Sequence, residues 1–189
     1  MSRPRSDVKR RAILDAAMQV FAERGIANSP TWAISKSAGV AEGTLFTYFE
    51  NKDALMAELY RELRQEFSRH LEDFPQDTDA KTRLRFIWDK YLDLGAKYPD
   101  HLKVLVQLRT SGKLFKENET PAPVFIDLFK ATHDAVVGNE LEAAPPELLV
   151  LMLRSQAEMA IEFIQANPEC AETCREVGFR MVWMGLTGK

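Results

Sequence analysis

The sequence predicts an all-α protein. Apolar residues recur at steps of three and four along most of the 189-residue chain, and no segment shows the period-two alternation of a half-buried strand. Glycines, prolines and capping residues divide this pattern into about nine segments. We therefore expect three short N-terminal helices with a helix-turn-helix, a fourth linking helix and a larger C-terminal helical bundle.

The first expected helix covers residues 6–24. It carries Ile13, Ala17 and Phe21 at four-residue steps on one side, which is the spacing of a buried helical face. Gly25 follows directly, where a left-handed glycine commonly ends a helix. The sequence thus indicates both the buried face of this helix and its end.

Two shorter helices follow. Ser29 and Pro30 predict an N-cap and a first helical residue, and this second helix ends near residue 37 because Gly39 comes next. A third helix is expected over residues 42–49. The two helices and the glycine between them have the arrangement of a helix-turn-helix unit.

The rest of the chain continues in helical segments. Asn51 is placed to cap a long fourth helix whose leucines recur every four residues, and Asp79 and Asp100 are placed to cap the next two. Residues 111–123 are polar and contain two prolines, so we expect a loop there. The last three helices are expected over residues 124–137, over residues 146–166 and after a cap at Asn167-Pro168.

The composition indicates an ordinary globular protein. Hydrophobic residues make up 46% of the chain and charged residues 28%, and the longest apolar run, Leu148 to Leu153, is far shorter than the roughly 20 residues of a membrane helix. We expect no secretion signal. Cys170 and Cys174 form no disulfide framework, which favours a reducing cytoplasm.

Charge is unevenly distributed along the chain. The whole protein carries a net charge of -3, but basic residues outnumber acidic ones in the first fifty positions. A basic N-terminal portion on an acidic body is typical of a local contact with a polyanion. On charge alone, a solvated basic end explains the pattern equally well.

The helix-turn-helix segment has the residues that DNA recognition requires. Gly39 tolerates the positive φ of the turn, and the inner faces carry small or branched residues such as Ile34, Val40 and Leu45. The following helix is short enough to enter a major groove. Its hydroxyl groups can donate hydrogen bonds to phosphates.

The segments RAILDAAMQVFAERG and AISKSAGVAEGTLFTYFENKDAL resemble the DNA-binding domain of the tetracycline-repressor (TetR) family. The similarity extends over about the first 55 residues. The matching features are Ile13-Leu14, Ala16-Ala17, Phe21, Gly25, Ile34, Ala38-Gly39-Val40, Gly43-Thr44-Leu45, Tyr48-Phe49 and Lys52. The resemblance implies a DNA-binding domain at residues 1–52 and an effector-binding and dimerisation domain at residues 53–189.

The resemblance also implies which residues contact DNA. Thr31, Thr44, Tyr48 and Lys52 occupy phosphate-contact positions, whereas Ala41, Glu42, Gly43 and Thr47 face the bases. Arg3 and Arg5, with Lys9, Arg10 and Arg11, form a basic arm suited to the minor groove or flanking phosphates. Tyr48 has a second interpretation, packing against the first helix, and Phe49 is expected in the core.

Several residues depart from the family pattern. Phe46 lacks the hydroxyl of the tyrosine that many members carry, and Trp32 replaces a polar or basic residue. Glu42 leaves two interpretations open. Its carboxylate can accept a hydrogen bond from a cytosine amino group or simply favour the helix N-terminus.

The C-terminal region is expected to bind a small molecule and to dimerise. Its aromatic residues allow an apolar pocket with few polar groups, which favours an apolar or amphipathic effector. The candidate pocket residues are Trp88, Tyr91, Gln107, Phe125, Phe129 and His133. By the resemblance, the last two helices pair across a homodimer, with small residues Ala157, Ala160, Gly178 and Gly185 permitting close approach.

These features predict a cytoplasmic DNA-binding transcription regulator, most simply a repressor released from a palindromic double-stranded DNA operator. We expect no catalytic residues, no metal, no cofactor and no membrane partner. The three histidines lie in no metal-ligand spacing, and no nucleophile motif is present. The alternative is an α-helical small-molecule-binding protein or enzyme that does not bind DNA.

Overall fold

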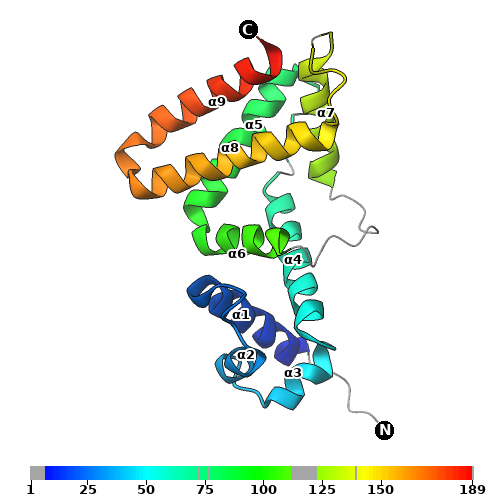
Figure 1. Ribbon diagram of the computed structural model, residues 1–189, viewed down its shortest axis with the longest axis vertical. Coiled ribbons are helices and arrows are strands. Elements are labelled where there is room, and N and C mark those ends of the chain that lie inside the picture. The colour runs from blue at the N-terminus through cyan, green and yellow to red at the C-terminus, as the bar shows by residue number, and fades with distance from the viewer. Residues whose placement is uncertain (1–6, 72, 76, 112–122, 139, 189) are drawn as a thin grey trace. The chain divides into compact units, whose positions relative to one another are not determined.

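The computed structural model describes residues 7–71, 73–75, 77–111, 123–138 and 140–188 and, within residues 123–129, the backbone alone. All regular structure in these ranges is helical (Figure 1). This confirms the all-α prediction. The described residues fall into two compact units. The first ends at Glu66 and resumes at Pro99, and the second contains Phe67–Tyr98 and the C-terminal part from Thr120 onward.

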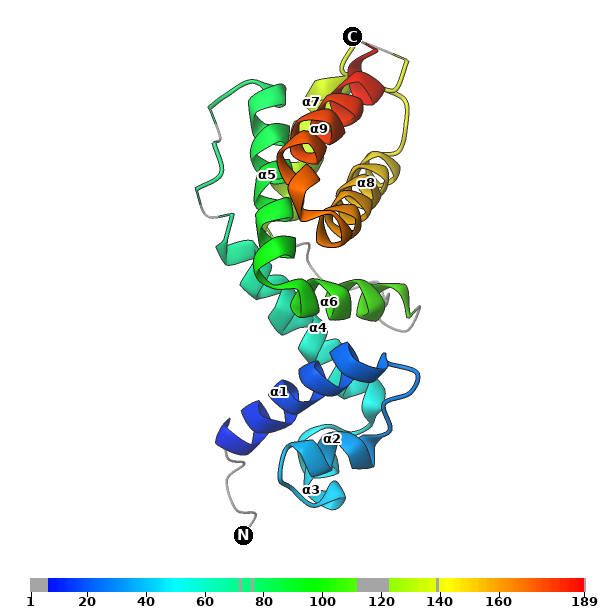
Figure 2. The ribbon, with the colours of Figure 1, turned by 90° about the vertical axis from the view of Figure 1, so that its left-hand side faces the viewer.

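The first unit runs from the N-terminal helix to Glu66 and includes one later helix. Its elements are α1 (Asp7–Arg24), α2 (Thr31–Ser37), α3 (Glu42–Tyr48), most of α4 (Lys52–Arg69) and α6 (Pro99–Thr110). Helix α1 contacts α2 and α6, and α2 and α3 lie side by side (Figure 2). The fully buried side chains include Ile13, Ala17, Phe21, Ile34, Leu45 and Leu55, so the predicted apolar face of α1 forms the core.

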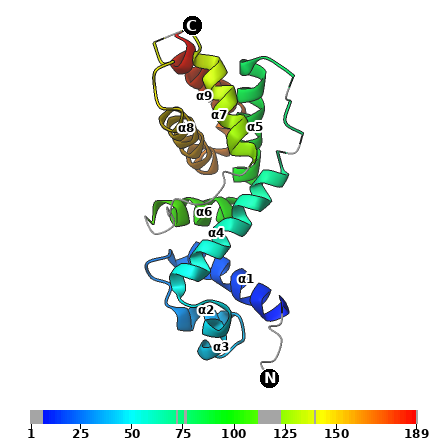
Figure 3. The same cartoon turned by 90° about the vertical axis from the view of Figure 1, so that its right-hand side faces the viewer.

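The second unit is a helical bundle. It contains α5 (Ala80–Lys97), α7 (Pro123–Val136), α8 (Pro146–Ala166), a 3-10 turn η1 (Pro168–Cys170) and α9 (Ala171–Thr187). Helix α5 contacts α7, α8 and α9, and α7 also lies against α8 (Figure 3). The bundle core is therefore built around α5.

Glycines allow two of these helices to approach α5 closely. A Cβ added to Gly95 of α5 would lie 2.5 Å from Cδ1 of Ile161 on α8, and one added to Gly178 of α9 would lie 2.6 Å from the Trp88 ring. Both distances are far below ordinary contact. Gly178 and Ala157, which is 2% exposed, therefore serve packing within one chain, whereas the sequence had suggested them for a dimer interface.

Several helix ends are as predicted. Gly25 and Gly39 have positive φ, 74° and 66°. The Asn51 side chain accepts a hydrogen bond from the Ala54 N–H at 2.8 Å. Asp79 likewise accepts from the Thr82 N–H at 2.9 Å, and these hydrogen bonds hold the pKa of the Asp79 carboxyl below its ordinary value.

The prediction that Ser29 caps α2 is wrong. Pro30 is the N-cap residue, and no side chain caps this helix end. The Ser29 hydroxyl is fully buried and donates to the Gly25 carbonyl at 2.6 Å and lies 3.2 Å from the Val20 carbonyl. The hydroxyl therefore binds backbone carbonyls near and just after the end of α1 and does not cap α2.

Two further cap predictions are wrong. Helix α6 begins at Pro99, whose fixed φ suits a first position, and Asp100 lies within the first turn. The Asn167 side chain donates back to the Phe163 carbonyl at 3.0 Å, so it closes α8. Helix α9 starts only at Ala171, after η1.

Two predictions concern regions rather than helix ends. Most of the expected loop at 111–123 lies outside the described residues. The compact units do not coincide with a boundary after residue 52, because α4 and α6 also belong to the first unit. That boundary concerns function and stays a prediction. No helix in the described ranges combines the length and apolarity needed to cross a membrane.

Candidate nucleic-acid interface

Helices α2 and α3 form a helix-turn-helix unit. The turn is closed by backbone hydrogen bonds from Gly39 N–H to the Lys36 carbonyl, 3.2 Å, and from Val40 N–H to the Ser35 carbonyl, 3.0 Å. Ile34 of α2 and Leu45 of α3 are both 0% exposed. The two helices are thus fixed to the core through their inner faces, which leaves the outer face of α3 for contacts.

The outer side of α3 carries the predicted DNA-facing residues. Four of them are exposed and two are half-buried: Ala41, Glu42, Gly43 and Thr47, and then Thr44 and Tyr48. A Cβ added to Gly43 would meet nothing within 4 Å, so the backbone is accessible there. Phe49 is 5% exposed, as expected of a core residue. The fold therefore gathers these positions on one short helix.

Thr31 and Glu42 join the starts of the two helices. The Thr31 hydroxyl donates to a Glu42 carboxylate oxygen at 2.6 Å. Thr31 is half-buried and Glu42 is exposed. The sequence suggested separate roles for these residues, at a phosphate and at a base, and did not indicate that they interact.

The Lys52 ammonium group binds within the domain. It donates to the Ile26 carbonyl at 2.6 Å and lies 5.7 Å from the centre of the Phe21 ring. An ammonium group has three donors, so this bond and a phosphate contact are compatible. The expected contact of Lys52 with DNA stays a prediction.

Two residues of the basic arm are neutralised by acidic residues of α4. Arg10 forms ion pairs with Glu58 and Glu62, and Arg11 pairs with Glu62 at 3.0 Å and with Asp15 at 2.8 Å. Both arginines thus have acidic partners within the domain, and their expected contact with DNA phosphates stays a prediction. Arg3 and Arg5 lie outside the described residues.

The six residues proposed for a pocket are divided between the two units, and their shared site stays a prediction. Trp88 and Tyr91 belong to the bundle: the Trp88 indole N–H donates to the Arg175 carbonyl at 3.0 Å, and the Tyr91 hydroxyl donates to Glu158 at 3.0 Å. Gln107 belongs to the first unit. The side chains of Phe125 and Phe129 lie outside the described residues.

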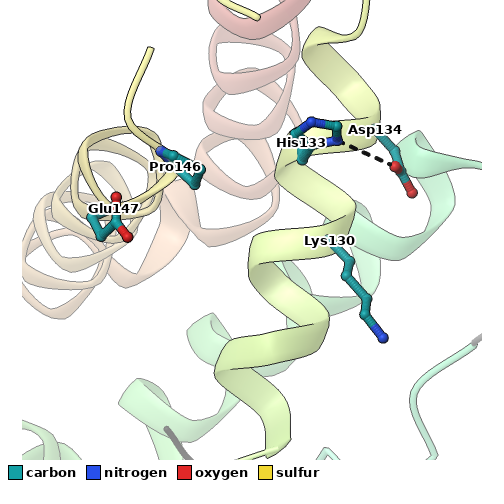
Figure 4. Close-up of a pocket in the computed structure, with 5 residues that line it drawn as sticks. All are labelled: Lys130, His133, Asp134, Pro146 and Glu147. Atoms are coloured by element: carbon teal, nitrogen blue, oxygen red, sulfur yellow. Dashed lines mark ion pairs between the residues drawn. The ribbon is translucent and has the colours of Figure 1, made fainter. Parts of the chain in front are cut away.

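His133 is exposed at the edge of a shallow surface hollow of about 330 Å³ between α7 and the start of α8 (Figure 4). Its lining residues are Lys130, His133, Asp134, Pro146 and Glu147. The Asp134 carboxylate lies 3.7 Å from His133 and 2.6 Å from Arg83. The hydrogen bond from Arg83 holds the pKa of Asp134 below its ordinary value. This hollow is open to solvent, unlike the enclosed cavity that holds most of a ligand's surface.

Gln107 has a contact that the sequence analysis missed. Its side-chain amide oxygen accepts a hydrogen bond from the Ile26 N–H at 3.3 Å. Lys103, one turn earlier on α6, donates to the Ala22 carbonyl at 2.8 Å. Together they bind the end of α1 and the loop that follows it. The signal in the sequence was a pair of polar residues four apart, and therefore on one face of α6.

These observations define a class: an all-helical protein with an N-terminal helix-turn-helix head. The sequence model of the family described as "Bacterial regulatory proteins, tetR family" matches residues 13–59, which include α2, α3 and the start of α4. Residues 13–59 of this chain are thus similar to the TetR family of regulatory proteins.

Curated relatives include the "Fatty acid metabolism regulator protein" of Bacillus subtilis (strain 168), which is 38% identical over 98 residues. This alignment covers 51% of the chain and 50% of that protein, so the chain spans about half the length of this relative. The "HTH-type transcriptional repressor KstR2" of Rhodococcus jostii (strain RHA1) is 27% identical over 82% of the chain and 79% of its own length.

Solved structures match over nearly the whole chain. A putative tetR family transcription regulator from Shewanella sp. PV-4 has a TM-score of 0.72 at 25% identity, covering 94% of this chain and 97% of that chain. The transcriptional regulator FadR from Bacillus subtilis, solved in complex with stearoyl-CoA, has a TM-score of 0.66 at 25% identity, covering 90% and 97%.

Proposed function

We propose that this protein is a transcription regulator that binds double-stranded DNA, most simply a repressor released from a palindromic operator by a small molecule. The observation that carries the proposal is the outer face of α3, where exposed polar positions and an accessible backbone lie on a helix short enough for a major groove. This face lies within the segment that matches the family. As a regulator it acts where the DNA is, in the cytoplasm, and not as an enzyme.

The proposed division of labour assigns residues 1–52 to DNA and 53–189 to effector binding and dimerisation. Thr44, Tyr48 and Lys52 contact phosphates, and Arg3 and Arg5 reach the flanking DNA. Four positions are proposed to face the bases: Ala41, Glu42, Gly43 and Thr47. Phosphate contacts fix the register of the head and base contacts supply selectivity.

Dimerisation is proposed to use α8 and α9. Both helices carry a second apolar stripe at helical spacing on the side away from the bundle core: Leu148, Leu151, Met152, Met159 and Phe163 on α8, and Val177, Met181 and Met184 on α9. Met159 is 69% exposed and Met181 is 66% exposed. An apolar surface of this kind is typical of a protein interface. In a two-fold dimer the two heads would read half-sites about 34–36 Å apart.

The effector is proposed to be an amphipathic molecule with a long acyl chain, in the class of acyl-CoA. Two relatives support this choice: one is named as a regulator of fatty acid metabolism, and another was solved with stearoyl-CoA. Trp88 and Tyr91 lie in the bundle where α5 meets α8 and α9, and with Phe125, Phe129 and His133 they stay candidates for its pocket. Gln107 is better explained by its contact with Ile26.

A mobility-shift assay on the DNA upstream of the protein's own gene tests DNA binding. We expect a sequence-selective shift that weakens steeply with salt, because binding releases counterions from the phosphates. A small-molecule carrier or enzyme would bind or convert its ligand and shift no DNA. The absence of any selective shift would contradict the proposed function.

The effector is tested on the same complex. Stearoyl-CoA is expected to dissociate the protein from its operator, since an effector shifts the DNA equilibrium by its differential affinity for the two states. Free coenzyme A, which lacks the acyl chain, serves as the matched control. If both compounds leave the complex intact while the DNA shift itself persists, the acyl-CoA assignment is wrong and the DNA-binding assignment stands.

A further inference from the structure

Thr31 and Glu42 form a side-chain pair that bridges the two helices of the head. They are the first residues of α2 and α3, and the hydroxyl donates to the carboxylate at 2.6 Å. This distance falls in the range of charge-assisted O–H to O⁻ hydrogen bonds, which are roughly twice as strong as neutral ones. The bond therefore restricts the orientation of an otherwise exposed glutamate.

The pair also limits what Thr31 can do. A threonine hydroxyl has one donor hydrogen and otherwise only acceptor lone pairs. That hydrogen is directed at Glu42, and a phosphate oxygen offers no hydrogen in return. As long as the pair is formed, Thr31 cannot donate to a phosphate.

The chemistry of the groove limits the target of Glu42. A carboxylate accepts hydrogen bonds and is repelled by phosphates, whereas the donors on base edges in the major groove are the amino groups of cytosine and adenine. Glutamate suits the cytosine amino group, while adenine is best matched by the bidentate amides of asparagine and glutamine. A carboxylate has two oxygens, so one can bind Thr31 while the other accepts from a base.

We propose that Thr31 is a positioning residue that holds the Glu42 carboxylate toward the major groove, where it accepts a hydrogen bond from a cytosine amino group and selects a C·G pair at one operator position. This inference rests on the proposed function. It assigns Thr31 to base selectivity and not to the phosphate contact that the family resemblance implies.

Selection of bound duplexes from a random-sequence DNA library, followed by sequencing, measures the preference at every position. For the wild type we expect one position in each half-site to favour cytosine about 5- to 150-fold. Glu42→Gln is expected to abolish this preference and move it toward adenine. Thr31→Val, which keeps the shape but removes the donor, is expected to weaken the cytosine preference at the same position only.

Thr31→Ser is the matched control, because it keeps the hydroxyl and should keep the cytosine preference. Thermal unfolding of each variant checks that the head is folded. If Thr31→Val weakens binding to all sequences equally, Thr31 is a phosphate contact and the inference is wrong. If Glu42→Gln leaves every base preference intact, it is wrong as well. A wild type that binds no duplex overturns the proposed function and this inference together.

Discussion

Gln107 shows that the role of a polar side chain is decided by its hydrogen-bond partner in the fold. Its polar side chain made it a candidate for a ligand pocket, yet its side-chain amide oxygen accepts a hydrogen bond from the Ile26 N–H in the first unit. The Ile26 carbonyl in turn accepts from Lys52. Both backbone polar groups of Ile26 are therefore satisfied by side chains from α6 and α4, which fixes the loop between α1 and α2 on which the head depends.

Glu176 gives a prediction at the residue scale. Its carboxylate is bound by both terminal nitrogens of Arg85, one at 3.0 Å, and this hydrogen bonding holds the pKa of Glu176 below its ordinary value of 4.5. A carboxyl whose pKa is lowered by folding adds stability above its unfolded pKa and loses it as the pH falls through the folded value. The contribution of Glu176 should therefore be present at pH 7 and decline below about pH 4.5.

Urea unfolding of the wild type and Glu176→Gln at a series of pH values tests this. We expect the wild type to be the more stable at pH 7 and the difference to shrink in acid. In an Arg85→Met background, which lacks the partner, the same substitution should show no such trend. A difference that stays constant between pH 7 and pH 3 would show that the ion pair does not contribute.

At the scale of elements, the bundle is organised by close crossings on α5. Gly95 faces Ile161 of α8, and Gly178 of α9 faces Trp88. The α5–α9 contact is further held by Arg175, which pairs with Asp89 at 3.0 Å and Asp93 at 2.5 Å. Neither crossing leaves room for a methyl group, so the identity of each glycine determines how closely the helices pack.

Gly95→Ala is expected to destabilise the protein by about 1–3 kcal/mol, although alanine is the better helix former by about 1 kcal/mol. The added methyl group would overlap three Ile161 carbons, the nearest at 2.5 Å. Denaturant unfolding measures the loss. In the double variant Gly95→Ala with Ile161→Ala, the cost should be smaller than the sum of the single costs, because the overlap is gone. Strict additivity would contradict the crossing.

At the scale of the whole molecule, the exposed apolar stripes of α8 and α9 make a second copy of the chain the expected partner. Each helix has its buried stripe turned to the bundle, with residues such as Leu153 and Val182 below 10% exposure, and a separate exposed stripe. A surface helix needs only one apolar stripe to fold. We therefore propose that the second stripe serves association.

Met181→Lys is expected to convert the dimer to a monomer, because a charged side chain would be buried without a partner at the interface. Sedimentation at micromolar protein concentration measures the state. Met181→Leu keeps an apolar group of similar size and should stay dimeric. The lysine variant should also lose operator affinity, since a monomer engages one half-site. A wild type that sediments only as a monomer would count against the interface.

The sequence by itself determined the elements of this protein and its similarity to a family of regulators. Local signals suffice for these. The periodicity of apolar residues predicted the nine α-helices found in the described ranges. The predicted turn or cap residues that the structure confirms act on neighbouring residues of the chain: Gly25, Gly39, Asn51 and Asp79. The head was predictable for the same reason, because its turn and its two helices lie within one short segment.

Only the tertiary structure decided which distant groups meet. Three residues fit a capping pattern but have other roles. Ser29 and Asn167 donate to carbonyls at the preceding helix ends, and Asp100 follows Pro99, at which its helix already begins. Likewise Arg10 meets Glu58, and Thr31 meets Glu42. Side-chain pairing between helices depends on how the helices pack in the fold. The spacing of two such residues in the sequence therefore does not predict that they pair.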